Sequence, residues 1–262
     1  MAKKAADRAT HPSRARVPAS KGNVYFFSDA HLGLGSIDDD HRRERTIVEF
    51  LEFVRHRGSA LFILGDLFDY WFEYRTVVPK GHVRVLGALA ALADTGVEIS
   101  YLAGNHDFWM KSYFPEELGI QVYPHPIQRT IAGKRFLLHH GDGLLKRDTG
   151  YRLLKRVLRN RINIAVFSLL HPDVAGTVAR WSSRTSRKHT SKQRYESDDM
   201  TQFAEEQIRA GYDYVIMGHN HAPVERNLGS GRYVNLGDWI ESNSYAVFDG
   251  RDLRLERWPA KD

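Results

Sequence analysis

The segment Asn23-Val-Tyr-Phe-Phe27, followed directly by Ser28-Asp29-Ala30-His31, introduces a pattern that this chain repeats. A short apolar run that breaks off into acidic and histidine residues predicts a buried strand with a polar tip. In sheets flanked by helices, ligands bind outside the carboxyl ends of the strands, so we expect such tips to converge. The same pattern returns at 60–64 before Gly65-Asp66, 97–102 before Gly104-Asn105-His106-Asp107, 135–139 before His140-Gly141-Asp142, and 214–217 before Gly218-His219-Asn220-His221.

Helical periodicity separates these runs. Residues 41–57 place Ile47, Phe50 and Val54 on one face with charges opposite, and 81–95 and 197–210 also read as helices. Gly211 provides a stop for the last of them. Strands that alternate with helices predict an α/β fold.

The polar tips contain a set of metal-binding side chains. The chain has no cysteine, so nitrogen and oxygen must hold any metal. Asp29 and His31 are two residues apart, so in an extended segment they point the same way and can chelate one ion. Asp66 follows a glycine and is the natural bridging carboxylate of a two-metal site.

The remaining tips supply the second ion and a catalytic group. Asn105 offers a neutral oxygen, while His140 and His219 can complete the second ion and His221 faces back to the first. His106 is not needed as a ligand. It can protonate a leaving oxygen or stabilise phosphoryl charge, with Asp107 fixing its orientation.

Charge is distributed unevenly along the 262 residues, whose net charge is +6. Residues 1–21 carry six Lys/Arg and one acid, and 146–194 carry thirteen Lys/Arg and two acids, so the remainder is acidic. We therefore expect a flexible basic tail over 1–22, a main domain over 23–262 and a helical insertion over 146–194. The tail lacks the apolar centre of a secretory signal, and no apolar run approaches the ~20 residues that span a bilayer.

The insertion combines apolar and basic surfaces. Residues 151–159 place leucines and valine on one side and Arg/Lys on the other, and 162–170 are almost wholly apolar. We interpret this as a lid that takes acyl chains and phosphates and rests on anionic lipid headgroups. A small helical subdomain with a solvated basic face is the alternative.

From Asn23 onward, the polar tips and their order along the chain resemble those of the calcineurin-like metallophosphoesterase superfamily. The resemblance implies a four-layer α/β/β/α sandwich of two mixed sheets and hydrolysis assisted by two divalent metal ions, Mn with Fe or Zn as alternatives. It assigns one ion to Asp29, His31, Asp66 and His221, and the other to Asp66, Asn105, His140 and His219.

Four longer runs are similar to the UDP-2,3-diacylglucosamine pyrophosphohydrolases of lipid A synthesis. They are GDLFDYW (65–71), HGDGLLKRDTGYR (140–152), TSRKHTSK (185–192) and NLGDWIESNSY (235–245). The resemblance implies cleavage of a UDP-linked diacylated glucosamine to UMP and a lipid sugar 1-phosphate. It also implies substrate contacts by Asn105, Asp148, Arg187 and Lys188, and a peripheral position on the cytoplasmic face of the inner membrane.

One motif departs from that resemblance and keeps alternatives open. The best-matched enzymes carry GNRD where this chain has Gly104-Asn105-His106-Asp107, the general superfamily pattern. A soluble phosphodiesterase or nucleotide phosphatase is therefore the second hypothesis. No nucleic acid is expected, because the insertion interleaves its charges with aliphatic residues rather than with aromatic residues that stack on bases.

Overall fold

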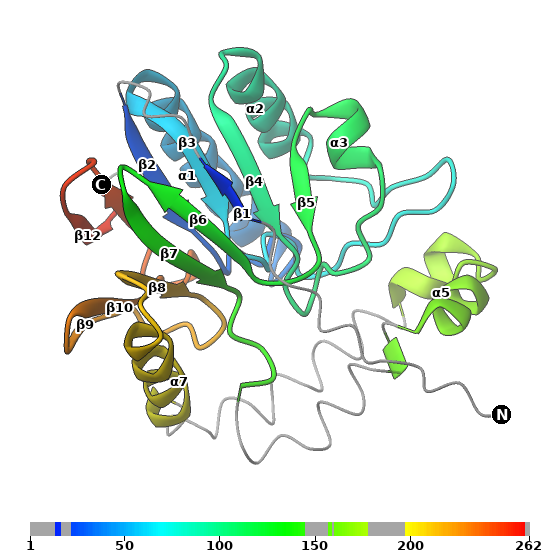
Figure 1. Ribbon diagram of the computed structural model, residues 1–262. Helices are drawn as coiled ribbons and strands as arrows, with labels where there is room; N and C mark the ends of the chain where they lie inside the picture. The colour runs from blue at the N-terminus through cyan, green and yellow to red at the C-terminus, as the bar shows by residue number, and fades with distance from the viewer. Residues whose placement is uncertain (1–13, 17–21, 145–156, 159, 178–196, 260–262) are drawn as a thin grey trace, which may run out of the picture.

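Two mixed β-sheets, each of six strands, form the centre of the molecule (Figure 1). The computed structural model describes residues 14–16, 22–144, 157–158, 160–177 and 197–259. The first sheet has the order β12-β11-β2-β3-β4-β5, and the second has the order β1-β6-β7-β8-β10-β9.

In the first sheet, β2 to β5 run parallel and β11 pairs antiparallel with both β2 and β12. The strands are β2 (Asn23–Phe27), β3 (Gly58–Ile63), β4 (Glu98–Leu102), β5 (Gln121–Tyr123), β11 (Ser244–Phe248) and β12 (Leu253–Arg257). Because β2, β3 and β4 are parallel neighbours, their carboxyl ends meet at one edge of the sheet.

In the second sheet, β7, β8 and β10 run parallel, while β6 is antiparallel to β7 and β9 is antiparallel to β10. The strands are β1 (Arg14–Arg16), β6 (Ile127–Ile131), β7 (Lys134–His139), β8 (Tyr214–Met217), β9 (Val224–Leu228) and β10 (Gly231–Asn235). Three residues of the predicted tail thus form a strand, which pairs parallel with β6.

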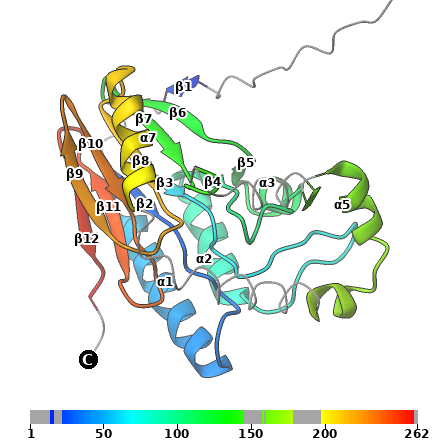
Figure 2. The same cartoon turned by 90° about the horizontal axis from the view of Figure 1, so that it is seen from below.

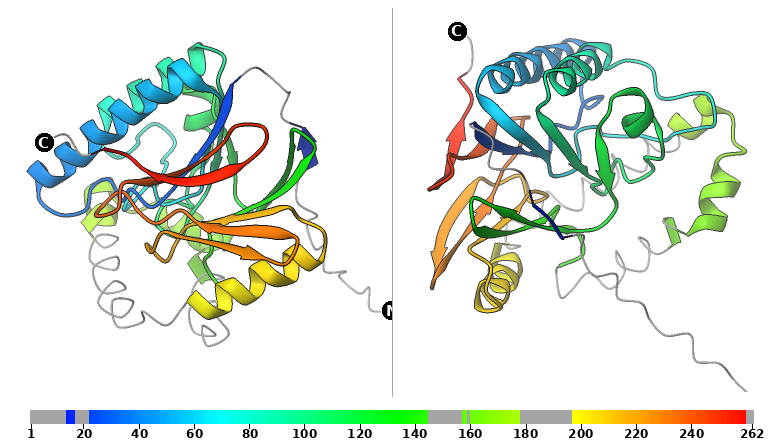
Figure 3. Two further views of the ribbon diagram at one scale, coloured as in Figure 1. Left: turned by 90° about the vertical axis from the view of Figure 1, so that its left-hand side faces the viewer. Right: turned by 45° about the horizontal axis from the view of Figure 1, so that its top comes forward.

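Helices cover the outer face of each sheet (Figure 3). On the first sheet they are α1 (Ile37–Arg57), α2 (Val83–Asp94) and α3 (Tyr113–Glu117), and on the second sheet α7 (Ser197–Arg209). The helix α5 (Arg161–Phe167) lies apart from both sheets, in the insertion (Figure 2). Phe50 of α1, Leu89 of α2 and Phe114 of α3 pack on the first sheet, and Ala204 of α7 packs on the second. The predicted four-layer α/β/β/α class is confirmed.

Aromatic side chains join the two sheets. Phe26 stacks on Phe62 at 5.2 Å between ring centroids and on Phe136 of the second sheet at 5.9 Å. Phe136 also meets Phe248 edge to face at 5.0 Å. All four are fully buried, so their contacts hold the sheets, and thereby the ends of their strands, in a fixed relation.

The described part of the insertion lies to one side of the sandwich, beside the loop between β3 and α2 (Figure 2). Phe167 at the end of α5 stacks on Trp109 at 5.0 Å and contacts Phe72 at 4.9 Å. The Trp109 indole donates to the Leu158 carbonyl at 3.1 Å. The boundaries at 22 and 146–194, and the lid itself, stay predictions. No helix in the described ranges is long and apolar enough to cross a membrane.

Replacing Phe136 with alanine should lower the free energy of unfolding by about 3–5 kcal/mol, because it leaves a cavity between the sheets. Urea denaturation followed by circular dichroism measures this. Phe136→Leu, which keeps most of the volume, should cost less than about 1.5 kcal/mol. Equal losses for both variants would show that the ring stacking, and not the filled volume, joins the sheets.

Candidate metal centre

The predicted ligands lie at the carboxyl ends of five strands drawn from both sheets. Asp29 and His31 follow β2, Asp66 follows β3 and Asn105 follows β4, all in the first sheet. His140 follows β7, while His219 and His221 follow β8, in the second sheet. The tips are therefore not on five adjacent strands of one sheet. They meet because the two packed sheets present their carboxyl ends to the same place.

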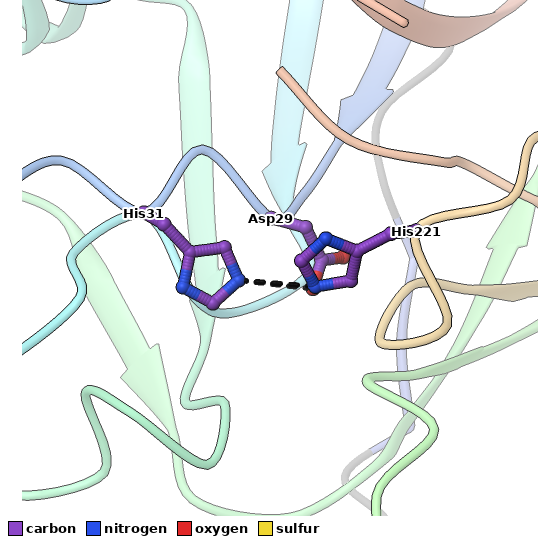
Figure 4. Close-up of side chains that lie close together, drawn as sticks. All are labelled: Asp29, His31 and His221. Carbon is purple, nitrogen blue, oxygen red and sulfur yellow. Dashed lines mark hydrogen bonds and ion pairs between the residues drawn. The ribbon is translucent and has the colours of Figure 1, made fainter. Parts of the chain in front are cut away.

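Asp29, His31 and His221 form the first cluster, with ligand atoms within 4.8 Å of one another (Figure 4). The two Nε2 atoms of His31 and His221 face each other at 3.2 Å. Asp29 Oδ1 lies 3.8 Å from His31 Nε2 and 3.6 Å from His221 Nε2. Three donor atoms thus surround one point.

Asp66, His140 and His219 form the second cluster, also within 4.8 Å. His140 Nε2 lies 3.3 Å from Asp66 Oδ2 and 3.0 Å from Asn105 Oδ1. The same Asp66 Oδ2 is 3.8 Å from His31 Nε2 in the first cluster. One carboxylate oxygen therefore lies between the two clusters.

Ring nitrogens of both clusters face acceptor atoms. His140 Nδ1 donates to the Leu64 carbonyl at 2.7 Å, and His221 Nδ1 faces Asp238 Oδ2 at 3.4 Å. In the neutral tautomer with Nδ1–H, each Nε2 carries a lone pair directed at oxygen or at another ring nitrogen. Asp29 Oδ1 is buried without a hydrogen-bond partner among the described residues. Such a donor set fits a divalent metal ion.

The pKa shifts of the histidines indicate that the clusters lack positive charge. Burial lowers the pKa of His140, but the Asp66 carboxylate outweighs it and the pKa is raised to about 10. Burial disfavours the charged form of His31, but the Asp29 carboxylate favours it. The pKa of His31 is therefore also raised to about 10. His219, buried beside His140, has a pKa lowered to about 4. The carboxylates thus draw positive charge into the cluster.

Most of the predicted metal ligands have a left-handed backbone conformation. Asp29, His31, Asp66, His219 and His221 all have positive φ, between 45° and 74°. L-residues other than glycine rarely adopt this conformation, and such strain concentrates at functional sites. A Cβ at Gly104 would collide with Asp66 Oδ1, and one at Gly218 would collide with Asp29 Oδ2. Glycine is therefore needed beside the ligands for close approach of the tips.

His106 lies beside the first cluster and is oriented by Asp69. Its Nδ1 is 3.1 Å from the Asp69 carbonyl oxygen and 3.6 Å from Asp69 Oδ1. The expectation that Asp107 orients His106 needs correction. The Asp107 carboxylate accepts from the Gly104 amide at 2.8 Å and from the Tyr101 hydroxyl, so it fixes the loop and not the ring.

Two acidic residues that the sequence analysis missed contact the predicted ligands. Asp69 Oδ1 lies 3.5 Å from His31 Nδ1, and Asp238 contacts His221. Asp238 Oδ1 also accepts three amides, from Ile240, Glu241 and Ser242. Their only signal in the sequence is their position after GDLF and NLG, within runs already quoted for other reasons.

The loop after β10 brings Asp238 to the site. The Trp239 amide donates to the Asp29 carbonyl at 3.1 Å, and the Trp239 ring packs on Phe27 and Phe50 in the core. The loop is therefore fixed directly after Asp238. The predicted substrate contacts Asp148, Arg187 and Lys188 lie outside the described residues.

The comparisons with known proteins agree with this geometry. Residues 22–223 match the family model for the calcineurin-like phosphoesterases. The UDP-2,3-diacylglucosamine hydrolase of Porphyromonas gingivalis is 38% identical over 255 residues, covering 90% of this chain and 97% of that protein. The enzyme of the same name from Nitrosococcus oceani is 34% identical, covering 84% and 89%.

Solved structures resemble the chain more distantly. An archaeal phosphodiesterase superposes with a TM-score of 0.46 at 13% identity, covering 89% of this chain and 98% of that one. The family match, by contrast, covers most of the chain, including all seven predicted ligands. The chain belongs to the calcineurin-like phosphoesterase family.

Proposed function

We propose that this protein hydrolyses the pyrophosphate bond of UDP-2,3-diacylglucosamine to release UMP and the 1-phosphate of the diacylated glucosamine. The observation that carries the proposal is the 38% identity, over nearly the whole of both chains, to a hydrolase named for that substrate. The two His/Asp clusters supply a site suited to phosphoric anhydride hydrolysis.

Two divalent ions, preferably Mn with Fe or Zn as alternatives, would be held by the two clusters. Asp29, His31 and His221 hold the first, while Asn105, His140 and His219 hold the second. Asp66 serves both, in keeping with the position of its Oδ2 between His31 and His140. When bound, such ions lower the pKa of water and neutralise charge on phosphoryl oxygens.

His106 acts on the substrate and not on the metal. Its Nδ1 faces Asp69, which leaves Nε2 for a phosphoryl or leaving oxygen. Asn105 contacts substrate as well as metal, and Asp148, Arg187 and Lys188 contact the sugar and phosphates. Asp107 supports the loop that carries Asn105 and His106.

The insertion over 146–194 binds the acyl chains and rests on an anionic membrane surface, which places the protein at the cytoplasmic face of the inner membrane. Its described part exposes a set of aliphatic side chains, 41% to 84% exposed, which suits contact with lipid. They are Val157, Ile162, Val166, Leu169, Leu170 and Val174. The Lys/Arg excess of the segment adds attraction to anionic lipid.

The substrate is tested by UMP release with Mn²⁺. The kcat/KM for UDP-2,3-diacylglucosamine should exceed that for the deacylated UDP-glucosamine by roughly a hundredfold, as expected if the insertion buries about four methylene groups of the substrate. Bis-p-nitrophenyl phosphate serves as the small diester control. Comparable kcat/KM for all three compounds would replace the proposal with a soluble phosphodiesterase of broad specificity.

Replacing Asp238 with asparagine should weaken Mn²⁺ binding by about 10- to 100-fold, because the carboxylate orients the His221 ring. Isothermal titration of the metal-free protein measures this without reference to activity. Asp249→Asn is the matched control, since Asp249 caps a turn by accepting from Arg251 and Asp252. An unchanged Kd for Asp238→Asn would remove Asp238 from the metal centre.

Replacing His106 with alanine should lower kcat by about 10²- to 10⁴-fold and leave the Kd for Mn²⁺ nearly unchanged. Asp69→Asn should have a smaller effect on kcat, since the Asp69 carbonyl still faces the ring. His56→Ala, on the exposed end of α1, is the control. Loss of metal from the His106 variant would instead make His106 a ligand.

A further inference from the structure

A cavity of about 390 Å³ lies at the seam between the core and the insertion. Its lining residues come from the loop after Phe72, from the loop after Trp109 and from the end of α5. They are Glu73, Tyr74, Arg75, Lys111, Ser112 and Ser168. The two loops begin at the predicted ligands Asp66 and Asn105, but none of the lining residues belongs to the metal clusters.

The cavity has an excess of positive charge. Arg75 and Lys111 are exposed and form no ion pair with any described residue, although Lys111 Nζ lies 5.5 Å from the Phe72 ring centroid. Glu73 is buried and its oxygens are occupied. One accepts from the Trp71 indole at 3.2 Å, and the other accepts from the Ser112 and Tyr113 amides. Two cations therefore remain for an external anion.

Tyr74 adds a hydroxyl without a partner. Its oxygen is buried and forms no hydrogen bond within the described part of the chain. A buried polar atom is normally paired, and an unpaired one calls for an explanation such as a missing ligand. Two unpaired cations suit the oxygens of a phosphate group, and the Tyr74 hydroxyl would join them if a side-chain movement exposes it to the cavity.

Exposed apolar residues follow the lining residues in the chain on both sides of the seam. On the core side, the Tyr74 amide donates to the Val77 carbonyl in a tight turn that leaves Val77 47% exposed. On the insertion side, Leu169 and Leu170 follow Ser168 and are 84% and 41% exposed. A free phosphate would gain nothing from these aliphatic neighbours, whereas a lipid would place its acyl chains against them.

We propose that this cavity binds the phosphate of an anionic phospholipid headgroup, with Arg75 and Lys111 on the phosphate oxygens and the acyl chains against Val77, Leu169 and Leu170. The inference rests on the proposed membrane association and names its binding site. It adds a lipid site separate from the metal centre, so that docking on the membrane orients the seam toward the bilayer.

Sedimentation of the full chain with phosphatidylcholine vesicles, with and without phosphatidylglycerol, tests the site. Arg75→Gln combined with Lys111→Gln should weaken binding to the anionic vesicles by about tenfold or more. Tyr74→Phe should weaken it only a few-fold. The control, Arg251→Gln with Arg257→Gln, removes the same charge from exposed positions at β12 and should bind as the unmodified protein does.

Three outcomes would overturn the inference. They are no binding of the unmodified protein to anionic vesicles, unchanged binding by the Arg75/Lys111 variant, and an equal loss in the control pair, which would indicate general charge attraction. Inorganic phosphate provides a further arm. If it binds by titration calorimetry and only the Arg75/Lys111 variant loses it, while vesicle binding is unaffected, the cavity serves a soluble phosphate.

The same variant separates this inference from the proposed function. Arg75 and Lys111 lie outside the metal clusters, so UMP release from detergent-dispersed substrate should be unchanged while vesicle binding falls. Absence of UMP release by the unmodified protein would contradict the hydrolase and leave the vesicle result standing. Normal UMP release by a protein that does not bind anionic vesicles would contradict the headgroup site alone.

Discussion

The structure depends on one electrostatic constraint, which is that imidazole nitrogens and carboxylates from five strand ends face one another and require positive charge, supplied by a metal ion or by protons on His31 and His140. His31 and His221 direct Nε2 at each other, and His140 directs Nε2 at Asp66 and Asn105. Burying such acceptors together is costly unless a cation joins them. The clusters are therefore stable as a metal centre, and the surrounding loops are built to hold them in that state.

Holding these groups requires both sheets and a strained backbone. The aromatic stack from Phe62 through Phe26 to Phe136 fixes the sheets face to face, so strand ends that are distant in sequence reach one point. The positive φ angles at the ligands then turn the side chains inward, at a cost of about 1–3 kcal/mol each. The core packing compensates for this strain, and Trp239, packed on Phe27 and Phe50, extends that support to the Asp29 carbonyl.

The sequence was sufficient to predict the five strands that end at the site, three of the helices and the seven clustered residues, because apolar runs ending in Asp, Asn or His are local patterns. The predicted strand 214–217 matches β8, and the predicted helix 41–57 begins four residues late relative to α1. Relations between segments were not predictable. Asp69 and Asp238 reach His106, His31 and His221 only through tertiary folding, and Asp107 is turned away from His106 by its bonds to Tyr101 and Gly104. The division of the tips between two sheets likewise has no local signature.

The loops that carry the ligands also connect the metal centre to the insertion. The loop that begins at Asp66 leads to Phe72, and the loop that begins at Asn105 leads to Trp109. Phe167 of the insertion packs on the rings of both Phe72 and Trp109. A displacement of the insertion would therefore act on the two segments that hold Asp66 and Asn105, the proposed bridging carboxylate and the proposed amide ligand. The family fold determines the chemistry, while this aromatic contact makes the position of the insertion part of the geometry of the site. If substrate binds under the insertion as proposed, its binding and the geometry of the metal centre would stabilise each other through the rings of Phe72, Trp109 and Phe167.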